Sequence, residues 1–268
     1  MKIVLTGSSS GIGRFLADTL AARGHEICRL ARSPQDGFSF RCDVSDWNAV
    51  QSLAGEISSK WKSLDALICC AGIQDPIGPA MEIDPLAWRK NLAVNLDGTF
   101  FPIRALYPLL KKSPVRAKVI CFSGGGSTSP RPNFAAYGVA KTGVVRLVET
   151  LAAEWQGRPP DINAVAPGAI FTRMTEEVLA RGEKLAGSDE FAGASKLSRD
   201  NAARLEMVLG LVEFLLSEQS DGISGKLISA PWDPWSDFSK FRDELMKSDL
   251  YTLRRIVPED RGRNFGAK

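Results

Sequence analysis

The first thirteen residues restrict the fold of this chain more than any other part of the sequence. A short apolar run, Lys2 to Leu5, leads directly into Thr6-Gly7-Ser8-Ser9-Ser10-Gly11-Ile12-Gly13, and apolar residues at helical spacing follow. Glycines allow positive φ angles and let the backbone approach a pyrophosphate, and the start of a helix offers free N–H groups to an anion. This order of strand, glycine turn and helix predicts a dinucleotide-binding turn. A glycine-rich loop without a ligand is the alternative.

Apolar runs typical of strands alternate with helical stretches along the chain. They lie at 2–6, 26–31, 38–41, 64–71, 117–123, 161–165 and 226–229. This alternation predicts a doubly wound parallel sheet between two layers of helices, a three-layer α/β/α fold in a single domain. In such a sheet ligands bind at the edge formed by the loops after the carboxyl ends of the strands. We therefore expect the functional residues on those loops.

Length and composition agree with one large domain. The 268 residues are 44% hydrophobic and 24% charged, and no linker or internal repeat divides them. We assign the domain to 1–229 and regard 230–268 as a C-terminal extension packed on it. The polar stretch 172–201 is predicted to be a substrate lid, and a pair of surface helices is an equal alternative.

Charge and cysteine content argue against several classes of protein. The net charge of +3 and the scattered basic residues do not favour a nucleic-acid partner. No apolar run of 18 residues could span a membrane, and Met1, directly before the first strand, leaves no room for a signal peptide. We therefore expect a cytoplasmic protein. Five cysteines in mainly strand-like segments and one histidine, His25, favour buried reduced thiols over disulfides or a metal site.

A tyrosine and a lysine are spaced for proton transfer. In Tyr137-Gly138-Val139-Ala140-Lys141 the four-residue spacing puts the phenol and the ammonium on one face of a helix. A lysine charge close to a tyrosine favours the phenolate, so we expect Lys141 to lower the pKa of Tyr137 and Tyr137 to act as an acid/base. An ordinary amphipathic helix face is the alternative interpretation.

Seven motifs in one order carry a resemblance to a known family. They are Thr6-Gly-x-x-x-Gly-x-Gly, Asp43-Val44, Ala71-Gly72, Asn95, Ser123, Tyr137-x-x-x-Lys141 and Pro167-Gly168. Together they resemble the short-chain dehydrogenase/reductase family, and the resemblance runs from residue 2 to about residue 229. It implies a Rossmann fold and an NAD(P)-binding oxidoreductase.

The resemblance also implies roles for individual residues. Tyr137 would be the catalytic acid/base, Lys141 would hold the nicotinamide ribose, and Asn95 would support a proton-relay water. Cofactor contacts would come from the glycine turn, the end of the second strand, the loops after the third, fourth and sixth strands, and the tyrosine helix. These residues are Gly7, Ser9, Ser10, Gly11, Ile12, Gly13, Arg32, Asp43, Val44, Ala71, Gly72, Tyr137, Lys141, Pro167, Gly168, Ile170 and Thr172.

The chain departs from the family pattern in three places. Cys69-Cys70 replaces an Asn-Asn pair, and the end of the family pattern is replaced by Ser229 to Trp235 and a charged tail. The family's carbonyl-binding serine lies thirteen residues before the tyrosine, where this chain has Gly124. Ser123 is one residue earlier, and alternation along a strand would point its hydroxyl away unless the three glycines at 124–126 re-route the backbone. We favour Ser123 as the carbonyl binder, with Ser127 or no serine as the alternatives.

The end of the second strand predicts the choice of cofactor. An acidic residue there would bind the ribose 2′-hydroxyl of NAD, whereas an arginine accommodates the 2′-phosphate of NADP. Ala31 takes the place of the acidic residue and Arg32 follows it, so NADP is favoured over NAD. Arg14 could add a second phosphate contact. Against this, Asp36 lies close in sequence, and a surface arginine is often simply solvated.

The motifs together predict an NADP-dependent oxidoreductase that interconverts a secondary alcohol and a ketone, with a small-molecule substrate and no metal. The apolar stripe of the tyrosine helix, as in related proteins, predicts a homodimer or homotetramer. A nucleotide-sensing or scaffold protein that kept the NADP site is the main alternative, and a nucleotide-sugar epimerase or dehydratase is a third. Candidate substrate-wall positions are Gln74 to Pro76, Arg131 to Phe134, Met174, Trp232 and Trp235, although both tryptophans are better explained as pinning the tail to the core.

Overall fold

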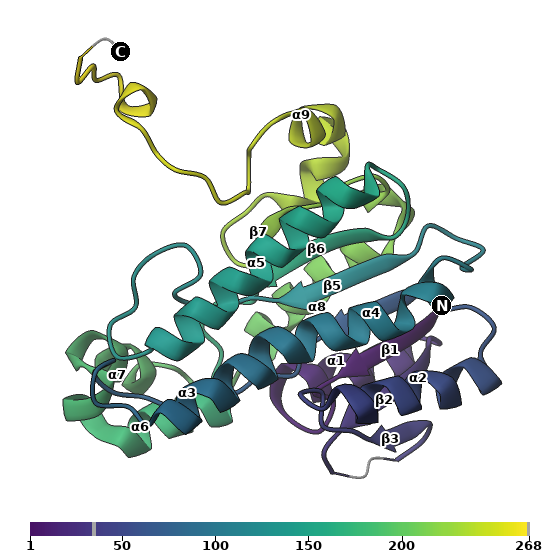
Figure 1. Cartoon of the computed structure of the whole chain (residues 1–268), viewed down its shortest axis with the longest axis horizontal. Helices are drawn as coiled ribbons and strands as arrows, with labels where there is room; N and C mark the ends of the chain where they lie inside the picture. Colours follow the sequence, from purple (N-terminus) through teal and green to yellow (C-terminus); the bar gives the residue numbers. More distant parts are fainter. Residues whose placement is uncertain (34–35, 267–268) are drawn as a thin grey trace.

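One parallel sheet organises the molecule (Figure 1). The computed structural model describes residues 1–33 and 36–266. In this part of the chain seven strands pair in the order β3-β2-β1-β4-β5-β6-β7. They are β1 (Lys2–Thr6), β2 (Glu26–Ala31), β3 (Ser39–Arg41), β4 (Ala66–Cys69), β5 (Lys118–Phe122), β6 (Asp161–Ala166) and β7 (Leu227–Ser229). Each predicted run contains its strand except 161–165, which β6 exceeds by one residue. β4 is shorter than its run because the Cys70 backbone N–H donates to the Thr6 hydroxyl instead of a neighbouring strand.

Helices cover both faces of the sheet, as predicted for a three-layer α/β/α fold. One face packs against α1 (Gly11–Ala22) and α8 (Ala202–Leu216), the other against α2 (Trp47–Lys60), α4 (Gly98–Leu110) and α5 (Ala135–Trp155). The remaining helices are α3 (Pro85–Leu92), a π-helical turn η1 (Ala93–Asp97), α6 (Arg173–Ala186), α7 (Ser188–Ser195), the short η2 (Glu218–Ser220), η3 (Trp235–Phe241), α9 (Arg242–Lys247) and η4 (Pro258–Arg261). None of the helices within residues 1–33 and 36–266 is long and apolar enough to cross a membrane.

Side chains of each central strand alternate between the two cores. On β5, Ile120 and Phe122 pack on the α1 and α8 side, whereas Val119 and Cys121 pack on the α2, α4 and α5 side. Strands buried on both faces are continuous apolar runs, which explains why these segments could be recognised in the sequence.

A buried ion network anchors the amino ends of β5 and β6. The Lys118 ammonium is almost fully buried and lies 3.0 Å from an Asp161 carboxylate oxygen and 2.6 Å from one of Asp221. Arg116 donates two further hydrogen bonds to Asp161, each 2.8 Å long. A buried charge is tolerated when it is paired in this way. This network holds the end of the sheet opposite the loops that follow the carboxyl ends.

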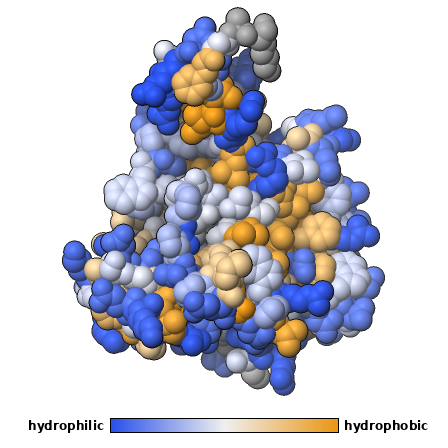
Figure 2. All heavy atoms as spheres, turned by 60° about the vertical axis from the view of Figure 1, so that its left-hand side comes forward, coloured by the Kyte–Doolittle hydropathy of each residue, from blue (hydrophilic) through white to orange (hydrophobic). Residues whose placement is uncertain are grey.

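The C-terminal segment first packs on the body and then leaves it. The Trp235 indole donates to the backbone carbonyl of Ala230, and the Tyr251 carbonyl accepts a hydrogen bond from the β7 backbone. From Arg254 onward the chain projects away from the other elements (Figure 1), and Figure 2 shows it standing above the surrounding surface. The interpretation that both tryptophans pin the tail is confirmed for Trp235 and wrong for Trp232, whose side chain is 83% exposed.

Candidate active site

A cleft of about 1090 Å³ runs along the loops after the carboxyl ends of the strands. It is lined by the glycine turn, by the ends of β2, β4 and β5, by the start of α5, and by the segment from the end of β6 through α7. Every cofactor-binding residue that the family resemblance implies lines it, as does Ser123, whereas Arg14 does not. Asn95 does not line it either and lies behind the wall. The fold therefore brings the motifs together, while their individual roles remain predictions.

The glycine turn forms a cradle that side chains would fill. Gly7 has a φ of +74°, and a Cβ atom there would lie 2.7 Å from the backbone nitrogen of Ala71. At Gly13 a Cβ atom would lie 2.3 Å from the carbonyl oxygen of Gly7. Ser10 precedes α1 without a side-chain capping bond, whereas the aspartates that cap α2 and α3 each accept two. The first N–H groups of α1 are therefore left for a bound anion, as a pyrophosphate site requires.

The far end of the cleft has an arginine and lacks an acidic side chain at the end of β2. Ala31 is buried there, and the exposed Arg32 lines the cleft beside it. Asp43, across the cleft wall, accepts hydrogen bonds from the backbone N–H and the hydroxyl of Ser45. Burial alone would raise the pKa of Asp43, but the bonds from Ser45 and the charge of Arg32 outweigh it and lower this pKa. Arg14 pairs with Asp18 and does not line the cleft.

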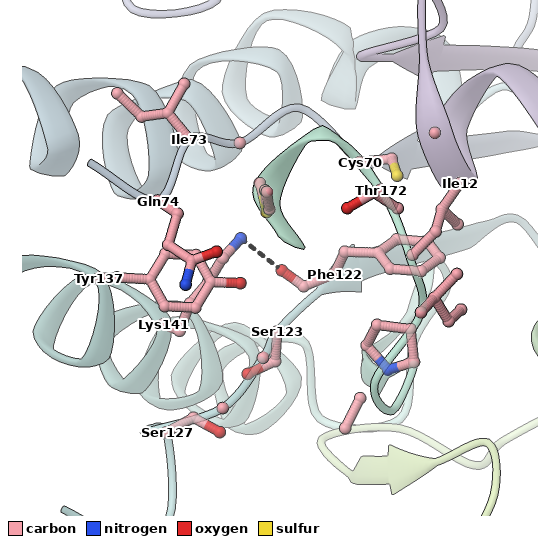
Figure 3. A pocket seen from close by; sticks show the side chains of 18 of the residues that line it. Ile12, Cys70, Ile73, Gln74, Phe122, Ser123, Ser127, Tyr137, Lys141 and Thr172 are labelled. Carbon is pink, nitrogen blue, oxygen red and sulfur yellow. Dashed lines mark hydrogen bonds between the residues drawn. The ribbon is translucent and has the colours of Figure 1, made fainter. Parts of the chain in front are cut away.

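Tyr137 and Lys141 lie one turn apart on α5, and both are buried (Figure 3). The Lys141 ammonium donates a 2.9 Å hydrogen bond to the backbone carbonyl of Phe122 and lies 5.7 Å from the centre of the Tyr137 ring. Burial raises the pKa of Tyr137 to about 12 and lowers the pKa of Lys141 to about 8. The prediction that Lys141 lowers the Tyr137 pKa is therefore wrong for the chain alone. The cation that does act in this direction is Arg131, and burial outweighs it.

Asn95 belongs to an asparagine pair that braces the wall of the cleft. It lies in η1, fully buried, and its Nδ2 donates to the backbone carbonyl of Ile73 at 2.8 Å and to Asn91 Oδ1 at 2.9 Å. Asn91, four residues earlier, in turn donates to the backbone carbonyls of Ile73, Gln74 and Asp75. Sequence reasoning missed Asn91, although its four-residue spacing from Asn95 was a usable signal. π-Helical turns are frequent at functional sites.

Ser123 lies directly after β5 and lines the cleft. The position that points at the Tyr137 hydroxyl is 124, because a Cβ atom added to Gly124 would lie 2.3 Å from that oxygen. The role of Ser123 as carbonyl binder stays a prediction. The residue is 3% exposed, and its Oγ has no hydrogen-bond partner among the residues described. Ser127 is also buried and lines the same cleft.

Gly124 allows Tyr137 to approach the end of β5. A Cβ atom at this position would lie 2.3 Å from the Tyr137 hydroxyl oxygen, well inside the limit for non-bonded atoms. The tyrosine hydroxyl thus occupies the space that a side chain at 124 would need.

Cys69 and Cys70 fill space beneath the glycine turn. Cys69 pairs in register with Cys121 across β4 and β5, and the Cys70 sulfur lies 3.4 Å from the place that a Cβ of Gly13 would take. Burial raises the pKa of the Cys70 thiol to about 12, so it is neutral at physiological pH. All five cysteines are free, and no cluster of three His, Cys, Asp or Glu within the described ranges could hold a metal.

The predicted lid segment forms two helices over the substrate end of the cleft. Arg131, in the loop before α5, makes two 2.6 Å hydrogen bonds to the carboxylate of Glu190 on α7, and its guanidinium lies 3.9 Å from the centre of the Phe134 ring. Gly182 and Gly187, at the breaks in α6 and before α7, have φ angles of +72° and +89°. Whether α6 and α7 move remains a prediction. Glu190 had no recognisable signal in the sequence, because its role depends on a contact between distant segments.

Comparison with known proteins gives one consistent result. Residues 7–230 match a family model described as enoyl-(acyl carrier protein) reductase. Galactitol 2-dehydrogenase (L-tagatose-forming) of Cereibacter sphaeroides is 34% identical over 67% of this chain and 75% of its own length. D-threitol dehydrogenase of Mycolicibacterium smegmatis is 29% identical over 75% and 86%. A short-chain dehydrogenase of Shigella flexneri, solved with NADP, superposes with a TM-score of 0.73 at 26% identity and covers 85% of this chain and 96% of its own.

Proposed function

The chain belongs to the short-chain dehydrogenase/reductase family, and from this we propose that it is an NADP-dependent enzyme that interconverts a secondary alcohol and a ketone. As a member of that family it is an NAD(P)-dependent oxidoreductase acting on CH–OH groups. The observation that carries the proposal is the position of Tyr137 and Lys141, one turn apart on α5, in the cleft that begins at the glycine turn. Relatives named for D-threitol and galactitol support a small-molecule alcohol as the substrate.

The cradle of the glycine turn fits a dinucleotide. Its free N–H groups and the start of α1 would hold the pyrophosphate. Asp43 and Val44 would flank the adenine, Lys141 would hold the nicotinamide ribose, and the segment from Pro167 to Thr172 would line the nicotinamide. When bound, this cofactor supplies the hydride.

Preference for NADP is supported by the end of β2. Arg32 could meet a 2′-phosphate, and the small Ala31 has no carboxylate to repel it. Two solved relatives at 26% identity contain NADP or NADPH.

The protein itself would position the substrate against the cofactor and supply a proton to the substrate. With a pKa of about 12, Tyr137 keeps its proton at neutral pH and can donate it to a carbonyl oxygen during reduction. A serine hydroxyl would orient that carbonyl, and Ser123 is favoured over Ser127 because its buried Oγ has no hydrogen-bond partner among the described residues and it lines the cleft. Lys141 and Asn95 would then resupply the proton.

We also propose a homodimer or homotetramer in the cytoplasm. Phe100 on α4 and Val139 on α5 are large apolar side chains left exposed on the single chain, and both belong to helices on one face of the sheet. Light scattering coupled to size-exclusion chromatography would measure the assembly directly.

The test of the function is NADPH and NADH oxidation with a panel of small ketones, compared between the wild type and Tyr137→Phe. Removing the phenol hydroxyl is expected to lower turnover by about 10²-fold or more and to leave nucleotide affinity nearly unchanged. Unchanged turnover would reject Tyr137 as the acid. Nucleotide binding without turnover of any ketone by the wild type would favour a nucleotide sensor instead.

A further inference from the structure

Two residues of the cleft carry buried polar atoms without a hydrogen-bond partner among the residues described, Ser123 Oγ and Gln74 Nε2. The other such atoms in the described part of the chain belong to residues that do not line the cleft. A buried donor without an acceptor is unfavourable, and native structures contain few. Figure 3 shows Gln74, which follows β4, and Ser123, which follows β5, in the same cleft as Tyr137.

The backbone that carries Gln74 is held by several hydrogen bonds. Asn91 donates to the carbonyl oxygens of Gln74 at 3.3 Å and Asp75 at 2.6 Å, and its own Oδ1 accepts from Asn95. Gln74 is only 4% exposed, so its amide has little freedom to reach water. A partly unsatisfied amide on a fixed backbone in the cleft that contains Tyr137 is suited to recognise one polar atom of a bound molecule.

The neighbouring side chains narrow the chemistry of that atom. The apolar side chains clustered with Tyr137, among them Val178 and Ala194, offer no acceptor to the Gln74 amide. Two cations lie over the Tyr137 ring, Lys141 and Arg131. Lys141 donates to the Phe122 carbonyl and Arg131 is paired with Glu190, which argues against an anionic substrate group. The substrate group that fits the Gln74 N–H donor is therefore a neutral oxygen acceptor.

We propose that Gln74 donates a hydrogen bond to a second oxygen of the substrate, a hydroxyl on the carbon next to the reacting carbonyl. Ser123 and Tyr137 then bind the carbonyl oxygen, and the preferred substrates are α-hydroxy ketones in reduction and vicinal diols in oxidation. This proposal rests on the function proposed above and names the substrate class of the same cleft.

The test compares two ketones that differ by one hydroxyl, 3-hydroxy-2-butanone and 2-butanone, with NADPH as the reductant. The wild type is expected to favour the hydroxy ketone in kcat/KM by about tenfold or more, which corresponds to about 1.4 kcal/mol. Gln74→Met keeps the length of the side chain and removes the donor. It is expected to lower kcat/KM for the hydroxy ketone about tenfold and to change that for 2-butanone less than about threefold.

Gln51→Met on the exposed face of α2 is the matched control, and its selectivity should equal that of the wild type. If the Gln74→Met variant fails to fold, the proposal is tested by the wild type alone, through the ratio of its kcat/KM for the hydroxy ketone to that for 2-butanone. Equal kcat/KM for both ketones in the wild type, or equal losses for both in Gln74→Met, overturns the role of Gln74 and leaves the oxidoreductase function standing. Cyclohexanone and 2-hydroxycyclohexanone serve as a second pair of ketones. If the wild type reduces none of the four compounds, the proposed function is overturned together with the inference.

Discussion

A Cβ atom added to Gly124 would lie 2.3 Å from the hydroxyl oxygen of Tyr137, so the two positions compete for one space. Members of the family usually have a serine where this chain has Gly124. Here the phenol reaches the backbone just after β5, and the serine beside this glycine is Ser123. The absence of a side chain at 124 is therefore part of the geometry that positions Tyr137.

Gly124→Ala is expected to displace the Tyr137 hydroxyl and to lower kcat about 10²-fold, because a misplacement of about 1 Å can have that effect. NADPH affinity should change little. Gly125→Ala is the matched neighbour, since its Cβ would meet Arg131 at an ordinary 3.6 Å, and it should lower kcat less than about threefold. Steady-state kinetics of both variants measures the difference. A large gain in activity for Gly124→Ser would instead mean that the site is handicapped by the glycine.

The double variant Ala31→Asp, Arg32→Ala is expected to reverse the cofactor preference. The new carboxylate can accept a hydrogen bond from a ribose 2′-hydroxyl and repels a 2′-phosphate, and the lost guanidinium removes a charge-assisted contact. The ratio of kcat/KM for NADPH to that for NADH should fall about 10²-fold, since such contacts are each worth about 1.5–3 kcal/mol. Arg14→Ala, outside the cleft lining, is the control. An unchanged ratio in the double variant would place the phosphate elsewhere.

The pH profile of reduction is expected to be governed by Lys141. Burial lowers the pKa of this ammonium to about 8, whereas the pKa of Tyr137 is raised to about 12. As the pH rises through about 8, Lys141 loses its charge while Tyr137 remains protonated. The kcat/KM for NADPH, which reports ionisations of the free enzyme, should therefore be highest below pH 8 and fall above it. A guanidinium stays charged in this range, so Lys141→Arg should remove the fall even if its activity is lower. The same fall in that variant would point to another group.

The pair formed by Arg131 and Glu190 is expected to hold α7 over the cleft. Glu190→Gln weakens two charge-assisted hydrogen bonds and should raise the KM for the ketone several-fold without altering nucleotide affinity. A double-mutant cycle with Arg131→Ala should give a coupling energy of about 1–3 kcal/mol, because the pair is partly buried and bidentate. The exposed pair of Arg199 and Glu176 is the comparison, with an expected coupling below about 1 kcal/mol. Equal coupling in both pairs would contradict a special role for Glu190.

Local features of the sequence were sufficient to predict the sheet and the gathering of the main motifs. The strands of a fully buried parallel sheet are uninterrupted apolar runs. Glycine is required at 7 and 13 because an added Cβ atom would lie 2.7 Å and 2.3 Å from backbone atoms of Ala71 and Gly7. Because parallel strands end at one edge, the loops after them had to meet there. The same rule brought Asp43, Ala71 and Tyr137 to one cleft although 94 residues separate the first from the last.

The tertiary structure alone decided the features that depend on distance and burial. The sequence contains Tyr137 and Lys141 at the right spacing, but only the packed structure shows that burial outweighs the charge of Arg131 and raises the pKa of the tyrosine. The pairing of Arg131 with Glu190 and the closeness of Gly124 to the Tyr137 hydroxyl join segments that are not neighbours in the chain. A sequence determines periodicity and local conformation, whereas solvation and long-range contacts exist only once the chain has packed.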